Sequence, residues 1–181
     1  INNGGVSGGF SKTAGAGANT LIIDGTNSFS GAFTIASGTV QVGTGSTTGT
    51  LGTSAITNNA ALVFNRSNAA SFTNAISGSG TLTQSGAGNL SLSGANSFSG
   101  ATLISAGTLT AASGALAGTS GITVNGATLT AVNVNAAATL TLNATGLATI
   151  SAVDQTVGAV TNANATDANA LNFTASTGTV T

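Results

Sequence analysis

Seven residue types are missing from this sequence, and the absences narrow what the chain can do. It contains no cysteine, proline, methionine, histidine, glutamate, tryptophan or tyrosine. Without cysteine or histidine, the common pairings of a nucleophile with a base are unavailable. Without proline, no residue removes a hydrogen-bond donor from a strand that is paired on both sides. These absences favour a sheet-forming chain without catalytic machinery.

Charged residues are present but very few. Of 181 residues, the charged ones are Lys12, Asp24, Arg66, Asp154 and Asp167. Two cations are too few to bind a nucleic-acid backbone, and three aspartates spread along the chain do not form a carboxylate pair for hydrolysis. Calcium-binding solenoids carry a regularly repeated aspartate, which the glycine-rich N-terminal segment lacks. The sequence therefore predicts no catalytic residue, cofactor, metal site or nucleic-acid partner.

Long hydrophobic runs are absent too. The longest, from Ala60 to Phe64, has about five residues, whereas a membrane helix needs about 20. We therefore expect no membrane insertion of this segment. Yet 41% of the residues are hydrophobic, which is unlike the apolar-poor composition of disordered chains.

What is present favours strands. The 27 glycines, with abundant threonine, serine, asparagine and valine, would each cost roughly 0.5–1 kcal/mol in the interior of a helix. Apolar and polar residues alternate at 81–83, 89–92 and 139–142. This period of two is typical of half-buried β-strands.

One stretch occurs twice in the chain. The first copy has GTNSFSG at 25–31 and the second has GANSFSG at 94–100, with a difference at one position. Both lie in a longer frame of apolar residues and glycines that runs from Leu21 to Val40 and from Leu90 to Leu109. Such a copy predicts a structural repeat, and the offset fits about three turns of roughly 23 residues.

The corners of this repeat are its candidate site residues, with an architectural role. They are Gly25, Asn27, Phe29, Gly31, Gly94, Asn96, Phe98 and Gly100. We expect the glycines to adopt positive φ angles and the asparagines to hydrogen-bond within their own turns. The phenylalanines are expected to point into the core.

The pattern G-S-G-T-L-x-x-S-G-A-G-x-L-x-L-S-G-x-N-x-F-S-G-x-x-x-I-x-x-G-T-L resembles the autotransporter-associated β-strand repeat. Residues 76–129 match it closely and residues 6–62 loosely. The repeat is found in the secreted passenger domains of bacterial autotransporters and in related surface adhesins. The resemblance implies a right-handed parallel β-helix on a bacterial surface and carries no catalytic residues over to this chain.

The predicted fold is all-β: a right-handed parallel β-helix, or β-solenoid, of about eight rungs. It forms a single domain over residues 1–181, with repeat copies at about 21–64 and 90–129 and divergent rungs at 130–181. One rung buries four or five apolar side chains worth about 1.5–3 kcal/mol each. Ordering its backbone costs more than that, so rungs must stack to be stable. Val132 and Val160 are among the residues expected to point inward.

These properties predict a non-enzymatic structural protein, extracellular or at the bacterial cell surface. It would act as a stalk or adhesin segment, or as a self-assembling filament subunit. The expected partners are further copies, joined end to end through open rung edges, or the covalent continuation of a longer passenger. Host or cell-surface ligands are further expected partners.

An ice-binding β-solenoid is the alternative, because flat ranks of Thr-x-Thr can order water. The sequence has four such ranks: Thr81/Thr83, Thr108/Thr110, Thr128/Thr130 and Thr139/Thr141. The steps from each rank to the next are unequal and become shorter along the chain. We therefore expect that the ranks do not share one face of consecutive rungs.

Overall fold

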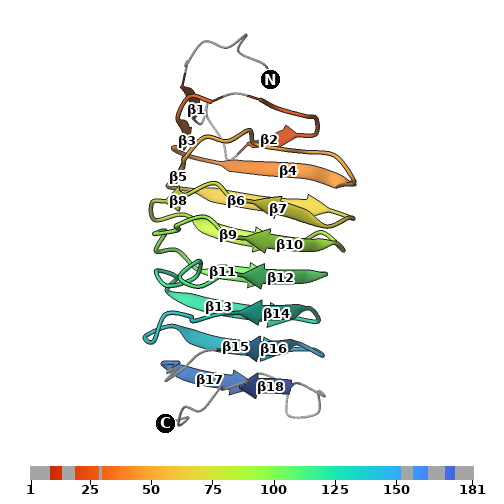
Figure 1. Cartoon of the computed structure of the whole chain (residues 1–181), viewed down its shortest axis with the longest axis vertical. Coiled ribbons are helices and arrows are strands. Elements are labelled where there is room, and N and C mark those ends of the chain that lie inside the picture. Colours follow the sequence, from red (N-terminus) through yellow and green to blue (C-terminus); the bar gives the residue numbers. More distant parts are fainter. Residues whose placement is uncertain (1–8, 14–18, 29, 152–156, 163–169, 174–181) are drawn as a thin grey trace.

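The chain forms a rod of stacked strands, with the first and last described strands at opposite ends of the rod (Figure 1). The structure, a computed structural model, describes residues 9–13, 19–28, 30–151, 157–162 and 170–173. All strand pairs between neighbouring turns in these residues are parallel, and no helix occurs among them. The predicted all-β parallel solenoid is confirmed. The right-handed sense of the coil stays a prediction.

Three parallel sheets form the sides of the solenoid. The four-stranded sheet has the order β1 (Phe10–Lys12), β3 (Phe33–Ile35), β5 (Ile56–Asn58) and β8 (Ile76–Ser77). The six-stranded sheet has the order β7 (Ala70–Phe72), β10 (Asn89–Leu92), β12 (Thr108–Ala111), β14 (Thr128–Ala131), β16 (Leu147–Ile150) and β18 (Ala170–Phe173). The eight-stranded sheet has the order β2 (Thr20–Ile23), β4 (Thr39–Ser46), β6 (Ala61–Arg66), β9 (Thr81–Gln84), β11 (Thr102–Ile104), β13 (Gly121–Asn125), β15 (Thr139–Asn143) and β17 (Ala159–Asn162).

The eight-stranded sheet runs the length of the rod, so the number and length of the turns can be read from its strands. Its strands mark about seven turns, close to the expected eight rungs. The longest turn in this sheet runs from Val40 to its partner Leu62, and the shortest runs from Ile122 to Leu140. Every turn measured here is shorter than the expected length of roughly 23 residues. That expectation is therefore wrong for this sheet, although two steps of the four-stranded sheet, from Phe10 to Phe33 and from Phe33 to Ile56, do span 23 residues.

These shorter turns put the two sequence copies out of phase. Leu21 lies in β2 and pairs with Val40 in the eight-stranded sheet. Leu90, its counterpart in the second copy, lies in β10 and pairs with Leu109 in the six-stranded sheet. The step from one copy to the other is thus more than three turns, and equivalent strands of the two copies form different sides of the rod. The fold tolerates this because each side asks for the same alternation of apolar and polar residues.

The core is a column of inward side chains that stack from one turn to the next. Leu62, Leu82 and Leu109 are fully buried. Aromatic rings add local contacts: Phe10 stacks on Phe33 with 4.9 Å between ring centroids, and Phe64 meets Phe72 edge to face at 4.5 Å. Each turn alone has too few apolar side chains for a core, so the stack as a whole supplies the burial.

Two inward predictions in the C-terminal third turn out differently. Val132 follows β14 on the outside of the rod and is 38% exposed, so that prediction is wrong. Val160 does take the inward register, opposite Leu140. It is still 47% exposed, because β17 is the last strand of the eight-stranded sheet and only one side of it is covered. In the described part of the chain, no helix is long and apolar enough to cross a membrane.

Candidate functional site

The glycines of the repeat corners serve close approach between turns rather than unusual backbone angles. None of Gly25, Gly31, Gly94 and Gly100 has a positive φ, so that expectation is wrong. A Cβ on Gly94 would overlap the carbonyl oxygen of Asn74 in the preceding turn, and one on Gly100 would overlap that of Gly80. These two positions exclude side chains because parallel turns are in backbone contact there.

Positive φ angles occur elsewhere in the same repeat. Gly38 has φ 75° and Gly107 has φ 61°, and these residues begin the matching G-T-V and G-T-L segments of the two copies. Such a conformation is strained for a residue with a Cβ. The repeat therefore contains two kinds of glycine, which the sequence does not distinguish.

The two corner asparagines make different contacts. The Asn27 amide donates to the carbonyl of Gly25 at 3.1 Å, as expected for its own turn, and also to that of Thr50 in the next turn at 2.8 Å. The Oδ1 of Asn96 instead accepts from the Ile76 backbone N–H at 3.0 Å. Its amide donates to the Ala115 carbonyl at 3.2 Å. Asn96 thus links the turns on both sides of its own.

Two phenylalanines are predicted to be inward at these corners. Phe98 is 1% exposed, and its prediction is confirmed. Phe29 lies outside the described residues, so its prediction is untested. The described corner residues lie at different levels and on different sides of the rod, and they do not gather into one site.

Further amide side chains link the turns and were not predicted from the sequence. The Asn58 amide, fully buried, donates to the Thr81 carbonyl at 2.9 Å. The Asn74 amide donates to the Ser54 carbonyl at 2.8 Å. Both satisfy backbone oxygens at corners where the sheet ladder is interrupted, as buried polar groups require. The sequence spacing did not single them out, because Asn58 and Asn74 are 16 residues apart, less than the shortest turn of the eight-stranded sheet.

The charged residues clamp one loop between two turns. Residues 44–49, at and after the end of β4, carry three hydroxyls that donate to the Asp24 carboxylate: Thr44 at 3.0 Å, Ser46 at 3.2 Å, and Thr48. From the other side, the Arg66 guanidinium donates to the carbonyls of Thr47, at 2.6 Å, and Gly49. An anion from one turn and a cation from another therefore hold the loop without meeting each other. The other cation, Lys12, is buried in β1 and donates to the Asn19 Oδ1 at 2.6 Å.

The hydroxyls around Asp24 lower the pKa of its carboxyl below the ordinary value of 3.8. The hydrogen bond from Thr48 has the largest effect, followed by that from Thr44, while partial desolvation opposes them and Ser46 adds a smaller lowering. Hydrogen bonds to the charged form favour ionisation. Because the folded pKa lies below the unfolded one, the stabilisation is present above about pH 4 and is lost as the pH falls through the folded pKa.

We expect Thr48→Val to raise the Asp24 pKa towards 3.8, because it removes the donor with the largest effect on that carboxyl. A carbon-detected NMR titration of the Asp24 carboxyl measures the change. Thr47→Val is the matched control. Thr47 lies in the same loop, but its contact with Arg66 is through the backbone carbonyl, which the substitution leaves in place. A titration midpoint that is the same in the wild type and in Thr48→Val would contradict the prediction.

Hydroxyl side chains form a column along the outside of the six-stranded sheet. Consecutive strands place one after another in register: Ser71, Ser91, Thr110, Thr130 and Thr149. Beside it, Thr108 pairs with Thr128. The ranks Thr108/Thr110 and Thr128/Thr130 therefore do share a face of consecutive turns, contrary to expectation. The other two ranks lie in β9 and β15 of the eight-stranded sheet, with two strands between them.

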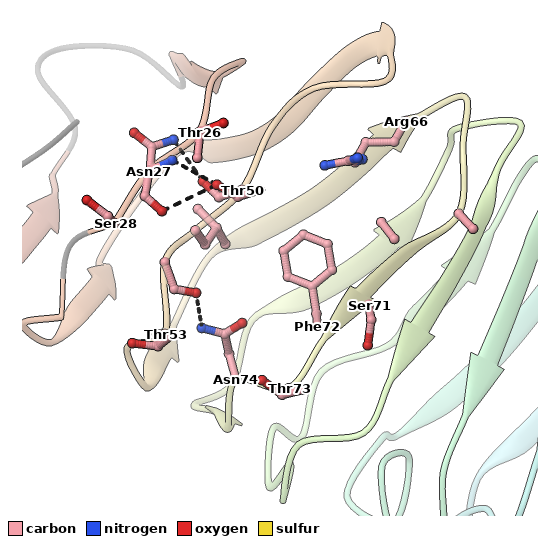
Figure 2. A pocket seen from close by; sticks show the side chains of 14 residues that line it. Thr26, Asn27, Ser28, Thr50, Thr53, Arg66, Ser71, Phe72, Thr73 and Asn74 are labelled. Atoms are coloured by element: carbon pink, nitrogen blue, oxygen red, sulfur yellow. Dashed lines mark hydrogen bonds between the residues drawn. The ribbon is translucent and has the colours of Figure 1, made fainter.

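A groove of about 580 Å³ is hollowed beside the six-stranded sheet at its N-terminal edge, shown in Figure 2. Its floor includes the buried side chains of Leu51 and Phe72. Threonine, serine and asparagine form most of its rim, and Arg66 lies at one end. No sequence motif pointed to this groove, because the three chain segments that line it belong to three successive turns.

The described residues contain no cluster of side chains of the kind that binds a metal ion. No group of three or more histidine, cysteine, aspartate or glutamate side chains gathers within the described ranges. Asp24 is exposed and engaged with hydroxyls. Asp154 and Asp167 lie outside the described residues.

Stacked parallel turns, joined by ladders and amide side chains, define the class: a β-solenoid repeat protein. Two segments, residues 16–42 and 82–111, match the model of a family described as passenger-associated-transport-repeat. The chain thus carries an autotransporter passenger repeat in two copies, which confirms the resemblance seen in the sequence. Each matched segment contains one copy of the N-S-F-S-G motif. No curated protein and no solved structure matches the chain.

Proposed function

We propose that this chain is a non-enzymatic segment of an extracellular, cell-surface passenger whose functional product is the rod itself. The observation that carries the proposal is the eight-stranded sheet, in which each strand pairs with the strand of the next turn. A passenger-like structural domain of this kind fits the two passenger repeats. Its role would be that of a stalk or adhesin segment, or of a filament subunit.

The physics of the stack suits such a role. Each interior turn is held by ladder hydrogen bonds on both sides and by buried side chains, so stability grows with the number of turns. Asn96 and Asn58 add hydrogen bonds between turns at the corners. A rod that lengthens by repetition can project a binding surface away from a cell without needing a larger core.

Self-association is the first partner hypothesis. At the two ends of the eight-stranded sheet, β2 and β17 each have one strand neighbour among the described strands. Such an edge offers backbone donors and acceptors to another strand. A second copy, or the covalent continuation of a longer passenger, would extend the ladder there. Host or cell-surface ligands would then bind along the sides.

We expect the purified chain to form unbranched filaments, seen by electron microscopy and sedimentation, and Val160→Lys to abolish them. A lysine on this edge strand places a charge where the next turn would pack. Leu103→Lys is the control, because Leu103 is also exposed but lies on the interior strand β11. A stable monomer at high concentration would contradict assembly and leave the stalk or adhesin segment of a longer passenger.

Ice binding is the second candidate function, favoured by the in-register hydroxyl column on the six-stranded sheet. Thr108, Thr110, Thr128 and Thr130 form a two-by-two block there. Inhibition of ice recrystallisation that is lost in Thr130→Lys, with the fold unchanged by circular dichroism, would support it. Absence of inhibition by the wild type would remove this candidate.

A further inference from the structure

The six-stranded sheet begins abruptly at β7. Its order starts with this strand, whose one strand neighbour among the described residues is β10. The earlier turns do supply strands to the other two sheets: β3 to the four-stranded sheet and β4 to the eight-stranded sheet, for example. The sheet edge at β7 therefore lies on the side of the rod rather than at its end. Further turns stacked on the ends of the rod would not cover this edge.

The ladder between β7 and β10 shows which backbone groups face this edge. Phe72 pairs with Leu92, and the Phe72 carbonyl accepts from the Ser93 N–H at 3.1 Å. In a parallel sheet, successive residues direct their N–H and C=O groups to opposite sides. The N–H and C=O of Ser71 therefore point away from β10, towards the turn that contains residues 50–53.

The groove lies on that side. It is lined by residues 69–74 of the β7 turn, by residues 50–53 of the turn before, and by residues 26–28 of the turn before that. The buried side chains of Leu51 and Phe72 make an apolar floor. Ser71 and Thr73, on either side of Phe72 in the chain, are exposed (Figure 2). An additional strand here would place alternate side chains on this floor and the others outward, in line with the hydroxyl column.

The clamp on residues 44–49 holds the segment that leads into the groove lining at residues 50–53. The ladder between β4 and β6 loses its register between Val42 and Ser46. The loop that follows is tied by Arg66 through the carbonyls of Thr47 and Gly49. Arg66 lies at the opposite end of the groove from Asn74 (Figure 2). Its partners in the structure are carbonyl and amide oxygens, so its positive charge is not neutralised by them.

We propose that the free edge of β7 binds an extended peptide, which adds as a parallel strand in this groove. The occupant alternates apolar and hydroxyl side chains, like the strands of the solenoid, and carries a carboxylate at its N-terminal end. That end lies beside Arg66, because Arg66 precedes β7 and a parallel strand runs in the same direction. Main-chain hydrogen bonds to Ser71 supply binding, and the floor and Arg66 supply selectivity. This binding is independent of the proposed end-to-end assembly.

The probe is an acetylated and amidated peptide, Asp-Asn-Leu-Ser-Leu-Ser, which places an aspartate before the sequence of residues 89–93. We expect the peptide to shift the backbone NMR signals of residues 69–74 of the wild-type chain. It should also slow hydrogen exchange of the Ser71 amide at least tenfold at saturation. A matched peptide with asparagine in place of the aspartate should bind more weakly, and the difference should shrink as salt is added.

Ser71→Pro removes the N–H that faces the groove and leaves the hydrogen bonds of Phe72 to β10 in place, as proline on a sheet edge can. Binding should weaken at least tenfold in this variant and remain unchanged in Ser71→Ala, which keeps the N–H. Equal binding by both variants, or signal shifts confined to other residues, would overturn the proposal. If Ser71→Pro unfolds, unchanged exchange of the wild-type Ser71 amide with saturating peptide overturns it instead. Peptide-free dimers that Ser71→Pro disrupts would also overturn it, in favour of a second copy.

Discussion

Gly94→Ala should lower the free energy of unfolding by about 3 kcal/mol, since an added methyl group overpacks a site with no room to relax. The Cβ would overlap the backbone carbonyl of Asn74, and backbone cannot move aside as a flexible side chain does. The two turns would have to separate, which weakens ladder hydrogen bonds on either side. Urea denaturation monitored by circular dichroism measures the change.

Gly25→Ala is the matched control, because Gly25 is the counterpart of Gly94 in the first copy of the repeat. A Cβ on Gly25 would meet nothing within 4 Å, and its φ is not positive. We expect a change of less than about 1 kcal/mol, with a slight gain in stability if the unfolded chain loses freedom. Equal losses at the two positions would contradict backbone contact with Asn74 as the cause of the loss at Gly94.

Phe98→Ala should destabilise the chain by about 3–5 kcal/mol, as expected for a large aromatic side chain removed from a packed core. Phe98 is 1% exposed and lies in a turn with neighbours on both sides. Because each turn depends on the next, the loss should appear in hydrogen exchange as opening of the turns around it before the rest of the rod.

Leu103→Ala serves as the comparison for this variant. Leu103 belongs to the strand that follows Phe98, but it faces outward and is 37% exposed. Its truncation should cost about 0.5 kcal/mol. If both variants lost similar stability, the assignment of Phe98 to the core and Leu103 to the surface would be wrong.

The candidate sites were only partly foreseeable. Asn27 and Asn96 stand at the same place in the two copies, so a shared role within the turn was the natural expectation. Asn27 fulfils it through Gly25, whereas Asn96 bonds the turns before and after its own. Which carbonyl or N–H faces an asparagine depends on the backbone of another turn, far away in the sequence. The sequence around the asparagine does not indicate which residue of the other turn lies next to it.

The hydroxyl column and the β7 groove show the same limit. Thr110 and Thr130 are in register because the connection between them makes one full turn without a bulge. The longer turn that begins in β4 instead shifts the register between Val42 and Ser46. The length of each connection decides which side of the rod the following sequence segments occupy. The positions of the hydroxyl ranks and of the groove depend on the lengths of several connections, so spacing in the sequence could not predict them.

What the sequence determined by itself is the kind of object: strands rather than helices, an apolar interior and turns that must stack. Alternation of side chains and the balance between burial and chain entropy are local properties, and they suffice for these conclusions. Only the tertiary structure decided which side of the rod each copy of the repeat occupies, and why Gly94 excludes a side chain when Gly25 does not. It also revealed the open edge at β7. These features arise where one turn meets the next, and the meeting points depend on the length of every connection between them.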